Sequence, residues 1–478
     1  MRSPTDGEAG AIVTAKPKYE SLADDLAAMI ATKVIGDGER MPSLRTLARM
    51  RSLSIPTVSE AYRLLEDRGL IESRPRSGYF TLRAARLGGP GASRPSGRPV
   101  AVAGFAQALQ GAIARAGLAG APSGAAAPSA SFFPVMRLRS LLSKALRRRP
   151  YLLGEYAFAP GLPDLRRQIA RRAAGWGCSL DSDRMVVTNG AVEAIDLCLK
   201  ALTRPGDIVA VESPCYYGFL HLLEVHGLQA LEVATDSRKG LDVDALETAL
   251  NAHPIRACLV STTVTNPTGA TMPEGAKRRL VELLAQRSVP LIEDATFADL
   301  YAGGAAMAAR AFDRTGNVLL CASLTKTVAP GLRVGWVEAG KYAERVAFLK
   351  RVSSVGQPAI IQEVLAEYLA DGGIDRHLRR LRGSFARLVR QHTDMVALHF
   401  PPGARIVSPT GGFLLWVELP AAYDVTRRWS DISNVGLSLA AGPMFSAGGA
   451  FRSALRINAG VEWTSATSRA YESLRQFL

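Results

Sequence analysis

The sequence predicts an α/β protein with a small, mostly helical N-terminal domain and a large C-terminal domain built on a mostly parallel sheet. Three observations support this prediction. The chain has 478 residues, which exceeds the length that one hydrophobic core usually covers. Two short helical patterns joined by a turn precede a ribbon-like segment before residue 84. From Met185 onward, short Val/Ile/Leu-rich runs alternate with helical stretches.

The first element is a helix between Tyr19 and Lys33, and residues 1–15 before it are predicted to be disordered. Apolar residues recur in this helix at i, i+4, i+7 and i+8, which defines one buried stripe. The stripe consists of Leu22, Leu26, Met29 and Ile30. Pro42 and Ser43 then provide a turn and an N-cap for a second, short helix. That helix runs through Leu44, Leu47 and Ala48.

A third helix follows Ser54, which can serve as its N-cap, and has Pro56 in its first turn. Its apolar face consists of Val58, Ala61, Tyr62 and Leu65, and its polar face of Thr57, Ser59 and Arg63. Gly69 is expected to end the helix, and a ribbon is expected over residues 71–82. This order of elements is typical of a winged helix-turn-helix, whose third helix enters the major groove of DNA.

On this interpretation the DNA contacts come from the second helix, the third helix and the ribbon. The candidates are Arg45, Thr57, Ser59, Arg63, Arg74 and Arg76. The alternative is a small helical dimerisation or capping element whose arginines are only solvated.

Residues 84–129 are dominated by Ala, Gly, Pro and Ser and are predicted to form a mostly flexible linker, with a short Ala-rich helix over residues 105–118. Residues 84–150 contain 10 Lys/Arg and no Asp/Glu, so most of the net charge of +15 lies in and just after this linker. A linker that strengthens DNA binding in a salt-dependent way and a solvated linker without a fixed partner are both compatible with this charge.

The large domain is expected over residues 130–478, with a small C-terminal subdomain from about residue 375. Polar residues terminate several of its predicted strands, and ligand groups cluster at strand ends in such sheets. These residues are Asn189–Gly190, Asn266–Gly269, Asp294, and Ser323 with Lys326. The first two segments are also common turns in proteins that bind no ligand there.

The stretch SLTKTVAPGLRVGW, residues 323–336, is the most informative of these strand ends. It places Lys326 beside two hydroxyls and seven residues before Arg333. A lysine amine can form a Schiff base with an aldehyde cofactor, while hydroxyls and an arginine neutralise its phosphate. The stretch therefore indicates a pyridoxal phosphate site.

Two family resemblances extend this interpretation. The run GERMPSLRTLARMRSLSIPTVSEAYRLLEDRGLIESRPRSGYF, residues 38–80, resembles the GntR-type winged helix, and residues 130–478 resemble the aspartate-aminotransferase-like, fold-type I family. Together they resemble the MocR subfamily of GntR transcriptional regulators. The GntR resemblance implies that Arg45, Thr57 and Gly78 touch operator DNA.

The fold-type I resemblance implies pyridoxal 5'-phosphate as the cofactor and no metal. It assigns the Schiff base to Lys326, the pyridine nitrogen to Asp294, the ring hydroxyl to Asn266 and ring stacking to Tyr216. It assigns the phosphate to Gly190, Ala191, Val192, Ser323 and Arg333, with Tyr156 reaching in from a second subunit. Arg456 in the motif ALRINAG matches the arginine that clamps a ligand carboxylate.

The chain departs from these families at two places. Phe297 stands where fold-type I proteins usually have a tyrosine that donates to the ring hydroxyl. Only Asn266 would then support the ring oxygen, which should raise the proton affinity of the imine and disfavour efficient transamination. Ile55 and Pro56 stand where GntR proteins often have an arginine before the threonine, so base reading is expected to be weaker or different.

The sequence therefore predicts a regulator in which the cofactor on Lys326 senses an amino acid or related amine by exchange of that bond, and so alters binding to double-stranded operator DNA. The alternatives are a working aminotransferase with a DNA-binding appendage, and a cofactor-dependent dimerisation scaffold. A homodimer is expected. Because the five cysteines are scattered and no segment resembles a signal or membrane span, a soluble cytoplasmic protein is expected.

Overall fold

The computed structural model describes residues 17–32, 34–36, 38–67, 70–74, 77–81, 95, 97–102, 104 and 124–478. The chain forms two compact units, Met1–Ala84 and Ala85–Leu478.

The N-terminal unit has the three helices and the ribbon that the sequence predicts. The elements are α1 (Lys18–Ala31), α2 (Leu44–Arg51), α3 (Ile55–Asp67), β1 (Ile71–Arg74) and β2 (Gly78–Thr81). Ser43 caps α2 by accepting from the amide of Thr46 at 3.1 Å, and Ser54 accepts from the amide of Thr57 at 3.2 Å. The strands β1 and β2 pair antiparallel and form the wing. Gly69, the predicted end of α3, lies outside the described residues.

The apolar stripes of the three helices meet in one core, as their spacing predicts. Leu26 of α1 and Val58 and Leu65 of α3 are all at most 2 % exposed. The buried Tyr62 donates its hydroxyl to the carbonyl of Pro42 at 2.8 Å, which fixes α3 against the turn before α2.

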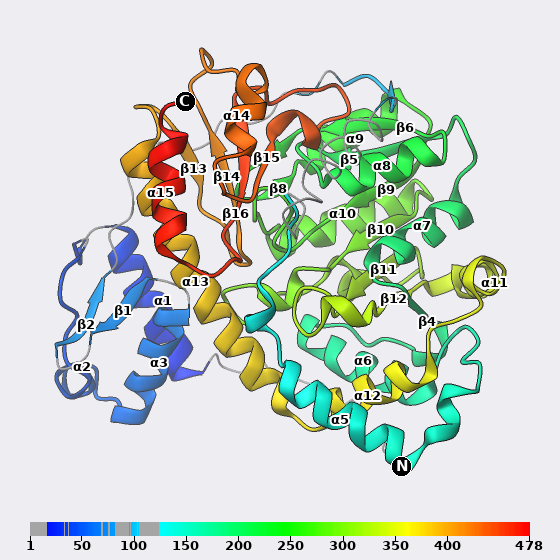
Figure 1. Cartoon of the computed structure of the whole chain (residues 1–478), viewed down its shortest axis with the longest axis horizontal. Coiled ribbons are helices and arrows are strands. Elements are labelled where there is room, and N and C mark those ends of the chain that lie inside the picture. The colour runs from blue at the N-terminus through cyan, green and yellow to red at the C-terminus, as the bar shows by residue number, and fades with distance from the viewer. Residues whose placement is uncertain are drawn as a thin grey trace, which may run out of the picture. The chain divides into compact units, whose positions relative to one another are not determined.

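The C-terminal unit is built on an eight-stranded sheet with the order β3-β6-β5-β9-β10-β11-β12-β4 (Figure 1). The four central pairs from β6 to β11 are parallel, and the other three pairs are antiparallel. In that order the strands are Val100–Ala101, Gln229–Val233, Ile208–Glu212, Ile255–Val260, Leu291–Asp294, Val318–Ser323, Gly335–Glu338 and Met185–Thr188. The mostly parallel sheet confirms the predicted fold class.

Helices cover both faces of this sheet. They are α5 (Val135–Arg148), α6 (Pro163–Ala173), α7 (Ala191–Leu202), α8 (Tyr217–Val225), α9 (Val243–Ala252), α10 (Glu274–Gln286), α11 (Ala343–Ser354) and α12 (Ala359–Ala370). Val209 and Val211 of β5 pack with α7 and α8 on one face, while Ala210 between them packs with α9 and α10 on the other. Near β4 and β11 the second face is covered by α5, α6 and α12.

A smaller antiparallel sheet, with the order β13-β14-β16-β15, lies within the segment predicted as a C-terminal subdomain. The elements of this segment are α13 (Gly373–His399), β13 (Arg405–Val407), β14 (Leu414–Glu418), α14 (Trp429–Ser433), β15 (Leu439–Ala441), β16 (Ala454–Asn458) and α15 (Ser465–Leu474). The long helix α13 leads to the sheet, and α15 packs against α13 (Figure 1). Elsewhere, the short strands β7 (Thr235–Asp236) and β8 (Gly240–Leu241) pair antiparallel with each other.

Two stretches of the predicted linker are ordered parts of the C-terminal unit. Strand β3 pairs antiparallel with β6 at the edge of the large sheet. Residues 124–129 make hydrogen bonds with both the large domain and the small sheet. Edge pairing and side-chain donors satisfy the main-chain groups of these two stretches, so these parts of a linker predicted to be mostly flexible are docked on the C-terminal unit. The helix predicted over residues 105–118 lies outside the described residues.

No helix in the described ranges has both the length and the apolar character needed to cross a bilayer. The five cysteines are buried and unbridged. The described residues contain no group of three or more His, Cys, Asp or Glu side chains that could hold a metal ion.

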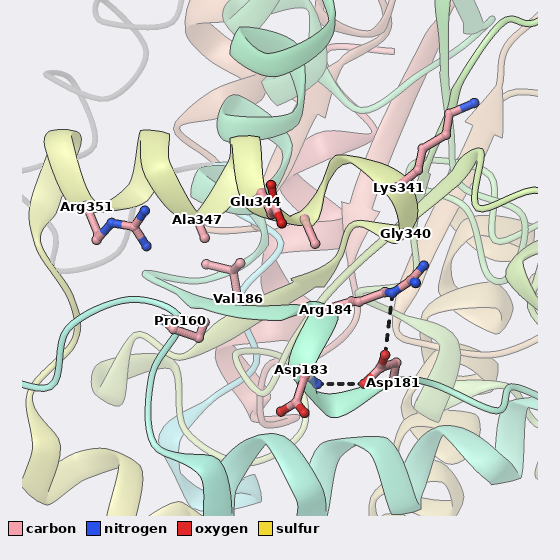
Figure 2. Close-up of a pocket in the computed structure, with 11 residues that line it drawn as sticks. Pro160, Asp181, Asp183, Arg184, Val186, Gly340, Lys341, Glu344, Ala347 and Arg351 are labelled. Carbon is pink, nitrogen blue, oxygen red and sulfur yellow. Dashed lines mark hydrogen bonds and ion pairs between the residues drawn. The ribbon is translucent and has the colours of Figure 1, made fainter.

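A hollow of about 650 Å³ lies on the C-terminal unit between β4 and α11 (Figure 2). Its charged lining is balanced, and Asp181 lies 3.4 Å from the guanidinium of Arg184. The charged residues are Asp181, Asp183, Arg184, Lys341, Glu344 and Arg351. None of the predicted cofactor or ligand residues lines it, so the candidate site lies elsewhere.

Candidate cofactor and ligand site

The carboxyl ends of β10 and β11 bring Asp294, Ser323 and Lys326 together. Asp294 pairs with Cys321 in the register of the two strands, and Ser323 ends β11. The Lys326 amine donates to the main-chain carbonyl of Ala126 at 2.6 Å. Burial, together with the charges of Arg456 and Arg333, lowers the pKa of Lys326 to about 8, against the opposing effect of Asp294. Lys326 is therefore closer to the neutral, nucleophilic form at physiological pH than an exposed lysine is.

Asp294 is a buried carboxyl whose orientation is fixed by its own turn. One of its oxygens accepts from the amide of Thr296 at 2.9 Å and from the hydroxyl of Thr296 at 2.5 Å. Burial raises the pKa of Asp294, while the Thr296 hydrogen bonds and the charge of Lys326 oppose that rise. A cationic partner would offset the cost of burying this carboxylate, and a protonated pyridine nitrogen is such a partner.

The N-terminus of α7 is shaped for close approach of a ligand. Gly190 precedes the helix with a φ of +85°, and a Cβ added there would lie 2.7 Å from a guanidinium nitrogen of Arg333. A Cβ at Gly335 would lie 2.8 Å from the amide nitrogen of Ala191. These two glycines keep the helix terminus and the arginine next to each other. Free helix amides and a guanidinium together form an anion site.

Ser323 adds an unsatisfied donor to the site. Its hydroxyl is buried and has no hydrogen-bond partner among the described residues. A buried hydroxyl without a partner is costly unless a ligand supplies one.

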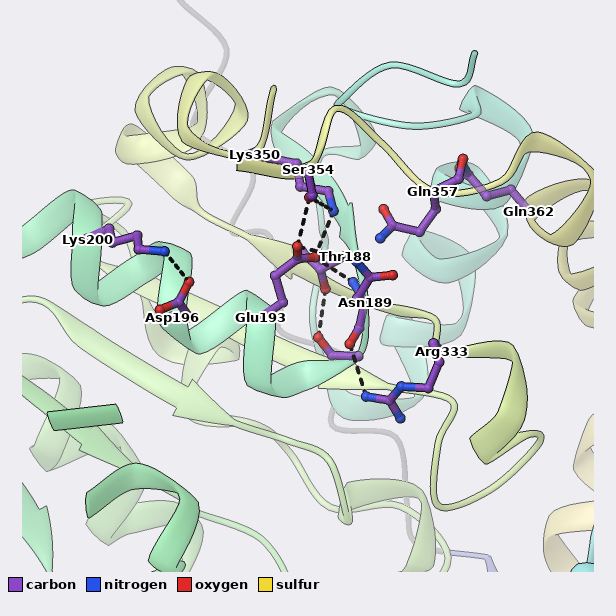
Figure 3. Close-up of polar contacts among 11 residues, drawn as sticks. Thr188, Asn189, Glu193, Asp196, Lys200, Arg333, Lys350, Ser354, Gln357 and Gln362 are labelled. Atoms are coloured by element: carbon purple, nitrogen blue, oxygen red, sulfur yellow. Dashed lines mark hydrogen bonds and ion pairs between the residues drawn. The ribbon is translucent and has the colours of Figure 1, made fainter. Parts of the chain in front are cut away.

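A charged network fixes the turn that precedes α7 (Figure 3). Glu193 accepts from the amide of Asn189 at 2.6 Å, from the buried amine of Lys350 at 2.7 Å and from the hydroxyl of Ser354 at 2.9 Å. The guanidinium of Arg333 donates to the Asn189 carbonyl at 3.1 Å. Although burial opposes them, the hydrogen bonds from Lys350 and Asn189 hold the pKa of Glu193 below its usual range. The sequence analysis missed Glu193, although its place in the first turn of a helix was a signal.

Arg456 lies fully buried on β16, where its hydrogen-bond partners are neutral groups, one of them the phenol of Tyr217. One terminal nitrogen donates to the side-chain oxygen of Asn266 at 3.0 Å, and the other donates to the carbonyl of Gly124. Its Nε has no partner among the described residues. The rings of Tyr217 and Phe445 lie 5.7 and 5.1 Å from its guanidinium carbon. Burial lowers the pKa of Arg456 from its usual range.

Tyr216 and Phe297 are the two aromatic residues predicted to lie beside the cofactor ring, and both are largely withdrawn from solvent. Burial raises the pKa of Tyr216, and the charges of Arg456, Asp294 and Arg333 all act on it, which places this phenol among the predicted site residues. Phe297 is buried and packs against Phe413, with ring centroids 5.5 Å apart.

Tyr156 does not enter this site within one chain. Its side chain is 77 % exposed and stacks on Phe158, with ring centroids 5.3 Å apart. The sequence analysis assigned it to the site of a second subunit, and that assignment stays a prediction.

Glu212, which the sequence analysis also missed, ends β5 fully buried. It accepts from the amide of Ser261 at 3.1 Å, and its second oxygen has no partner among the described residues. Burial raises its pKa to about 8, with a further contribution from Asp294. Glu212 is therefore mostly neutral at physiological pH and adds little negative charge beside Asp294.

The candidate DNA contacts of the N-terminal unit differ in how available they are. Arg45 is exposed on α2, and Gly78 is exposed at the start of β2 with a φ of +96°. Arg63 is paired with Glu60 one turn away on α3, with Nε 3.0 Å from a carboxylate oxygen. Thr57 shares a hydrogen bond with the hydroxyl of Ser54 at 2.7 Å.

Ser59 is half-buried on α3. The side chain of Arg74 and all of Arg76 lie outside the described residues. Arg40, which the sequence analysis did not single out, lies beside the wing, with guanidinium nitrogens 3.7 Å from the position of a Cβ on Gly78.

Comparisons with known proteins match both units. The family described as bacterial regulatory proteins, gntR family, matches residues 18–81, and aminotransferase class I and II matches residues 152–468. The uncharacterized HTH-type transcriptional regulator YdcR of Escherichia coli K12 is 36 % identical over 96 % of this chain and 99 % of that protein. The uncharacterized regulator YjiR of the same organism is 35 % identical over 92 % of this chain and 94 % of its own length.

The solved structures that resemble the chain support the fold alone. LysN, an alpha-aminoadipate aminotransferase from Thermus thermophilus, superimposes with a TM-score of 0.71 at 23 % identity, over 78 % of this chain and 97 % of LysN. That structure is a complex with N-(5'-phosphopyridoxyl)-L-leucine.

Pyridoxal phosphate is the cofactor of the aminotransferase class I and II family, and the residues at the strand ends fit it. The phosphate would find a hydroxyl without a partner at Ser323, room for close approach at Gly190 and a positive charge at Arg333. The ring nitrogen would find the buried carboxyl of Asp294. With this domain and its gntR-family module, the chain belongs to the aminotransferase class I and II family and to the MocR-type HTH transcriptional regulators.

Proposed function

We propose that this transcriptional regulator binds pyridoxal phosphate at Lys326 and responds to an amine that carries a carboxylate. The observation that carries the proposal is an excess of positive charge around Lys326: two arginines, Arg333 and Arg456, act on it against the single carboxylate of Asp294. The dianionic phosphate of the cofactor and the carboxylate of a ligand would balance this charge.

Each group at the site then has a defined task. The bound cofactor would supply an aldehyde that condenses with an amine and a ring that withdraws electrons. Lys326 would offer that amine in the resting protein, and Asp294 would hold a proton on the pyridine nitrogen. The side-chain oxygen of Asn266 accepts from Arg456, which leaves its amide nitrogen to donate to the ring oxygen of a bound cofactor. Tyr216 would cover one face of the ring.

The phosphate would be held at the N-terminus of α7. Gly190 lets the chain approach closely, the amides of Ala191 and Val192 donate, and Ser323 and Arg333 complete the anion site.

A ligand can regulate DNA binding only if it has different affinities for two arrangements of the protein. A ligand whose carboxylate binds Arg456 and whose amine takes the place of the Lys326 amine would supply such a difference. The direct test is titration of the cofactor-loaded protein with a panel of amino acids, followed by visible absorbance and by operator affinity in parallel. Spectral and operator changes with the same midpoint support the proposal, and a spectral change without any change in operator affinity contradicts it.

The lowered pKa of Lys326 also favours a second function, transamination, because a lysine that is often neutral can move the α-proton of a ligand. Incubation with amino donors and a keto acid distinguishes the two functions. Turnover on the order of 1 per second or faster would identify an enzyme with a DNA-binding appendage. No turnover and unchanged operator affinity with every amine would instead favour a dimerisation scaffold.

Phe297 provides a test of how the site is tuned. Phe297→Tyr would add a phenol that donates to the ring oxygen and stabilises its anionic form. We expect the pH midpoint of the visible spectrum to fall by on the order of one unit. Phe312→Tyr, on a half-buried ring that is not among the predicted site residues, is the control and should leave the midpoint unchanged. An unchanged midpoint in Phe297→Tyr would show that this position does not control the ring oxygen.

The homodimer is part of this proposal, because Tyr156 is exposed in its own chain and is assigned to the site of a neighbouring subunit. The segment from α5 to β4 exposes several large apolar side chains, which is typical of a surface that another chain covers. They are Val135, Met136, Tyr151, Leu153, Tyr156 and Phe158. Sedimentation of the full chain as a monomer at micromolar concentration would contradict it.

Arg45 is the exposed candidate for a DNA phosphate or guanine contact. We expect Arg45→Ala to weaken operator binding about tenfold and to reduce the slope of log affinity against log salt by about 1. Arg49→Ala removes an equivalent exposed charge from the same helix and is the matched control. Equal losses in the two variants would mean that α2 contributes only general charge.

A further inference from the structure

The six residues Gly124–Ser129, here called the strap, cross the candidate site and are held by its own functional groups. The carbonyl of Ala126 accepts from Lys326 at 2.6 Å, and the carbonyl of Gly124 accepts from Arg456. The side-chain amide of Asn458 donates to two strap carbonyls, at 3.0 and 2.9 Å.

The strap also joins the two parts of the C-terminal unit. Lys326 lies in the turn that follows β11 of the large sheet, whereas Arg456 and Asn458 lie on β16 of the small sheet. At the end of the strap, the amide of Ser129 donates to the carbonyl of Gly460 at 2.8 Å, and its hydroxyl accepts from the amide of Glu462 at 3.1 Å. The strap is therefore hydrogen-bonded to residues of both sheets at the point where a ligand carboxylate would bind.

The contacts of Arg456 leave it poorly satisfied. A fully buried guanidinium is stable when charged acceptors face it. The partners of Arg456 are instead the neutral oxygens of Asn266, Gly124 and the Tyr217 phenol, and its Nε has no partner among the described residues. A carboxylate would supply a full negative charge and two acceptor oxygens in a matching geometry. Of the partners of Arg456, the Gly124 carbonyl is the one that belongs to the strap.

We propose that the strap is an internal competitor for the ligand: its Gly124 carbonyl occupies the carboxylate position on Arg456, and a carboxylate-bearing ligand binds by displacing it. The inference rests on the proposed function, since it describes how the same site is regulated. The ligand class is thereby a small carboxylate that can reach Arg456, beside which the rings of Tyr217 and Phe445 lie.

Gly124 is the position at which the strap can be loosened selectively. It has a φ of +82°, and an added Cβ would lie 2.5 Å from the carbonyl oxygen of Leu439 and 3.2 Å from the Cβ of Ala440. Gly124→Ala must therefore shift the strap and its carbonyl. Gly97 also has a positive φ, +65°, but nothing lies within 4 Å of its added Cβ, so Gly97→Ala is the matched control.

The experiment follows hydrogen exchange of the peptide that contains the strap, in the cofactor-loaded full chain, with propanoate as the probe and chloride at equal ionic strength as the reference. In the wild type, propanoate should raise strap exchange several-fold. In Gly124→Ala, exchange should already be high without propanoate, and propanoate should bind about tenfold more tightly because its competitor is weakened. Gly97→Ala should behave as the wild type.

Asn458→Ala gives a second variant should Gly124→Ala fail to fold, because it removes two donors to the strap and leaves Gly124 in place. It should also tighten propanoate binding. Unchanged strap exchange at the highest propanoate concentration, or weaker binding in the loosened variants, would overturn the proposal and make the strap a fixed wall of the site.

The same samples separate this inference from the function on which it rests. If propanoate raises strap exchange but amino acids cause no spectral response, the proposal that the strap competes with the ligand is supported and the proposed amine sensing is contradicted. If amino acids change both the spectrum and operator affinity while the strap stays protected from exchange, the proposed amine sensing is supported and the competition by the strap is contradicted.

Discussion

Replacing Lys326 with alanine is expected to abolish the response of operator binding to every amine, while ligand-free operator affinity stays within about twofold of the wild type. Lys326 provides the amine at this site, and its pKa of about 8 makes that amine available near physiological pH. The DNA-binding module has its own core and its own caps, so the loss of a side chain from the C-terminal unit leaves its fold intact. The visible absorbance of the bound cofactor should also disappear.

Lys326→Arg is the matched control, because it keeps a positive charge near Asp294 but cannot condense with an aldehyde. It should also be colourless and unresponsive. If its operator affinity without ligand equals that of Lys326→Ala, the charge alone has no effect on DNA binding. Operator binding that still responds fully to an amine in Lys326→Ala would exclude covalent sensing at this residue, and so would borohydride treatment that traps no cofactor on the wild-type lysine.

The polar residues at the strand ends could be predicted from the sequence, because the same short pattern, an apolar run followed by a polar residue, recurs along the chain. Apolar runs such as those before Asp294 and Ser323 identify buried parallel strands, and parallel strands end at one edge of a sheet. The polar residues after those runs therefore had to converge, although they are distant in the sequence from the helix that begins after Gly190. The apolar stripes of the N-terminal helices were predictable for the same reason.

The strap could not be predicted, because its function lies in main-chain carbonyls. Residues 124–129 read as alanine, proline and serine after one glycine, and composition alone indicates a flexible chain for such a segment. Its order comes from donors distant in the sequence, such as Asn458 and Lys326. The pairing of Arg63 with Glu60 differs, since the spacing of three residues on a helix was visible in the sequence and was not used.

The charged network at Glu193 could not be predicted from the sequence, for a different reason. Lys350 is fully buried, which composition and periodicity do not anticipate for a lysine, and its partner is 157 residues away. A buried ion pair of this kind adds little to stability but fixes geometry, here that of the turn before the phosphate-binding helix.

Arg456→Met is expected to have opposite effects on ligand binding and on stability. Methionine fills much of the same volume but offers no donors, so amines with a carboxylate should bind about 100-fold more weakly, which corresponds to roughly 3 kcal/mol. Amines without a carboxylate should lose almost nothing. Titration of the visible spectrum with matched pairs, such as alanine and ethylamine, measures both affinities.

The stability of the cofactor-free protein should change little in Arg456→Met or should increase. Arg456 is a buried cation that faces only neutral acceptors, and burial lowers its pKa, so the folded protein gains from losing that charge. The loss of the hydrogen bonds to Asn266, Gly124 and Tyr217 opposes that gain. Thermal unfolding measures the balance, and Arg456→Lys, which keeps the charge but not the planar fork, separates charge from geometry. Equal losses of affinity for both kinds of amine, together with a lower Tm, would show that Arg456 supports the fold and does not recognise a carboxylate.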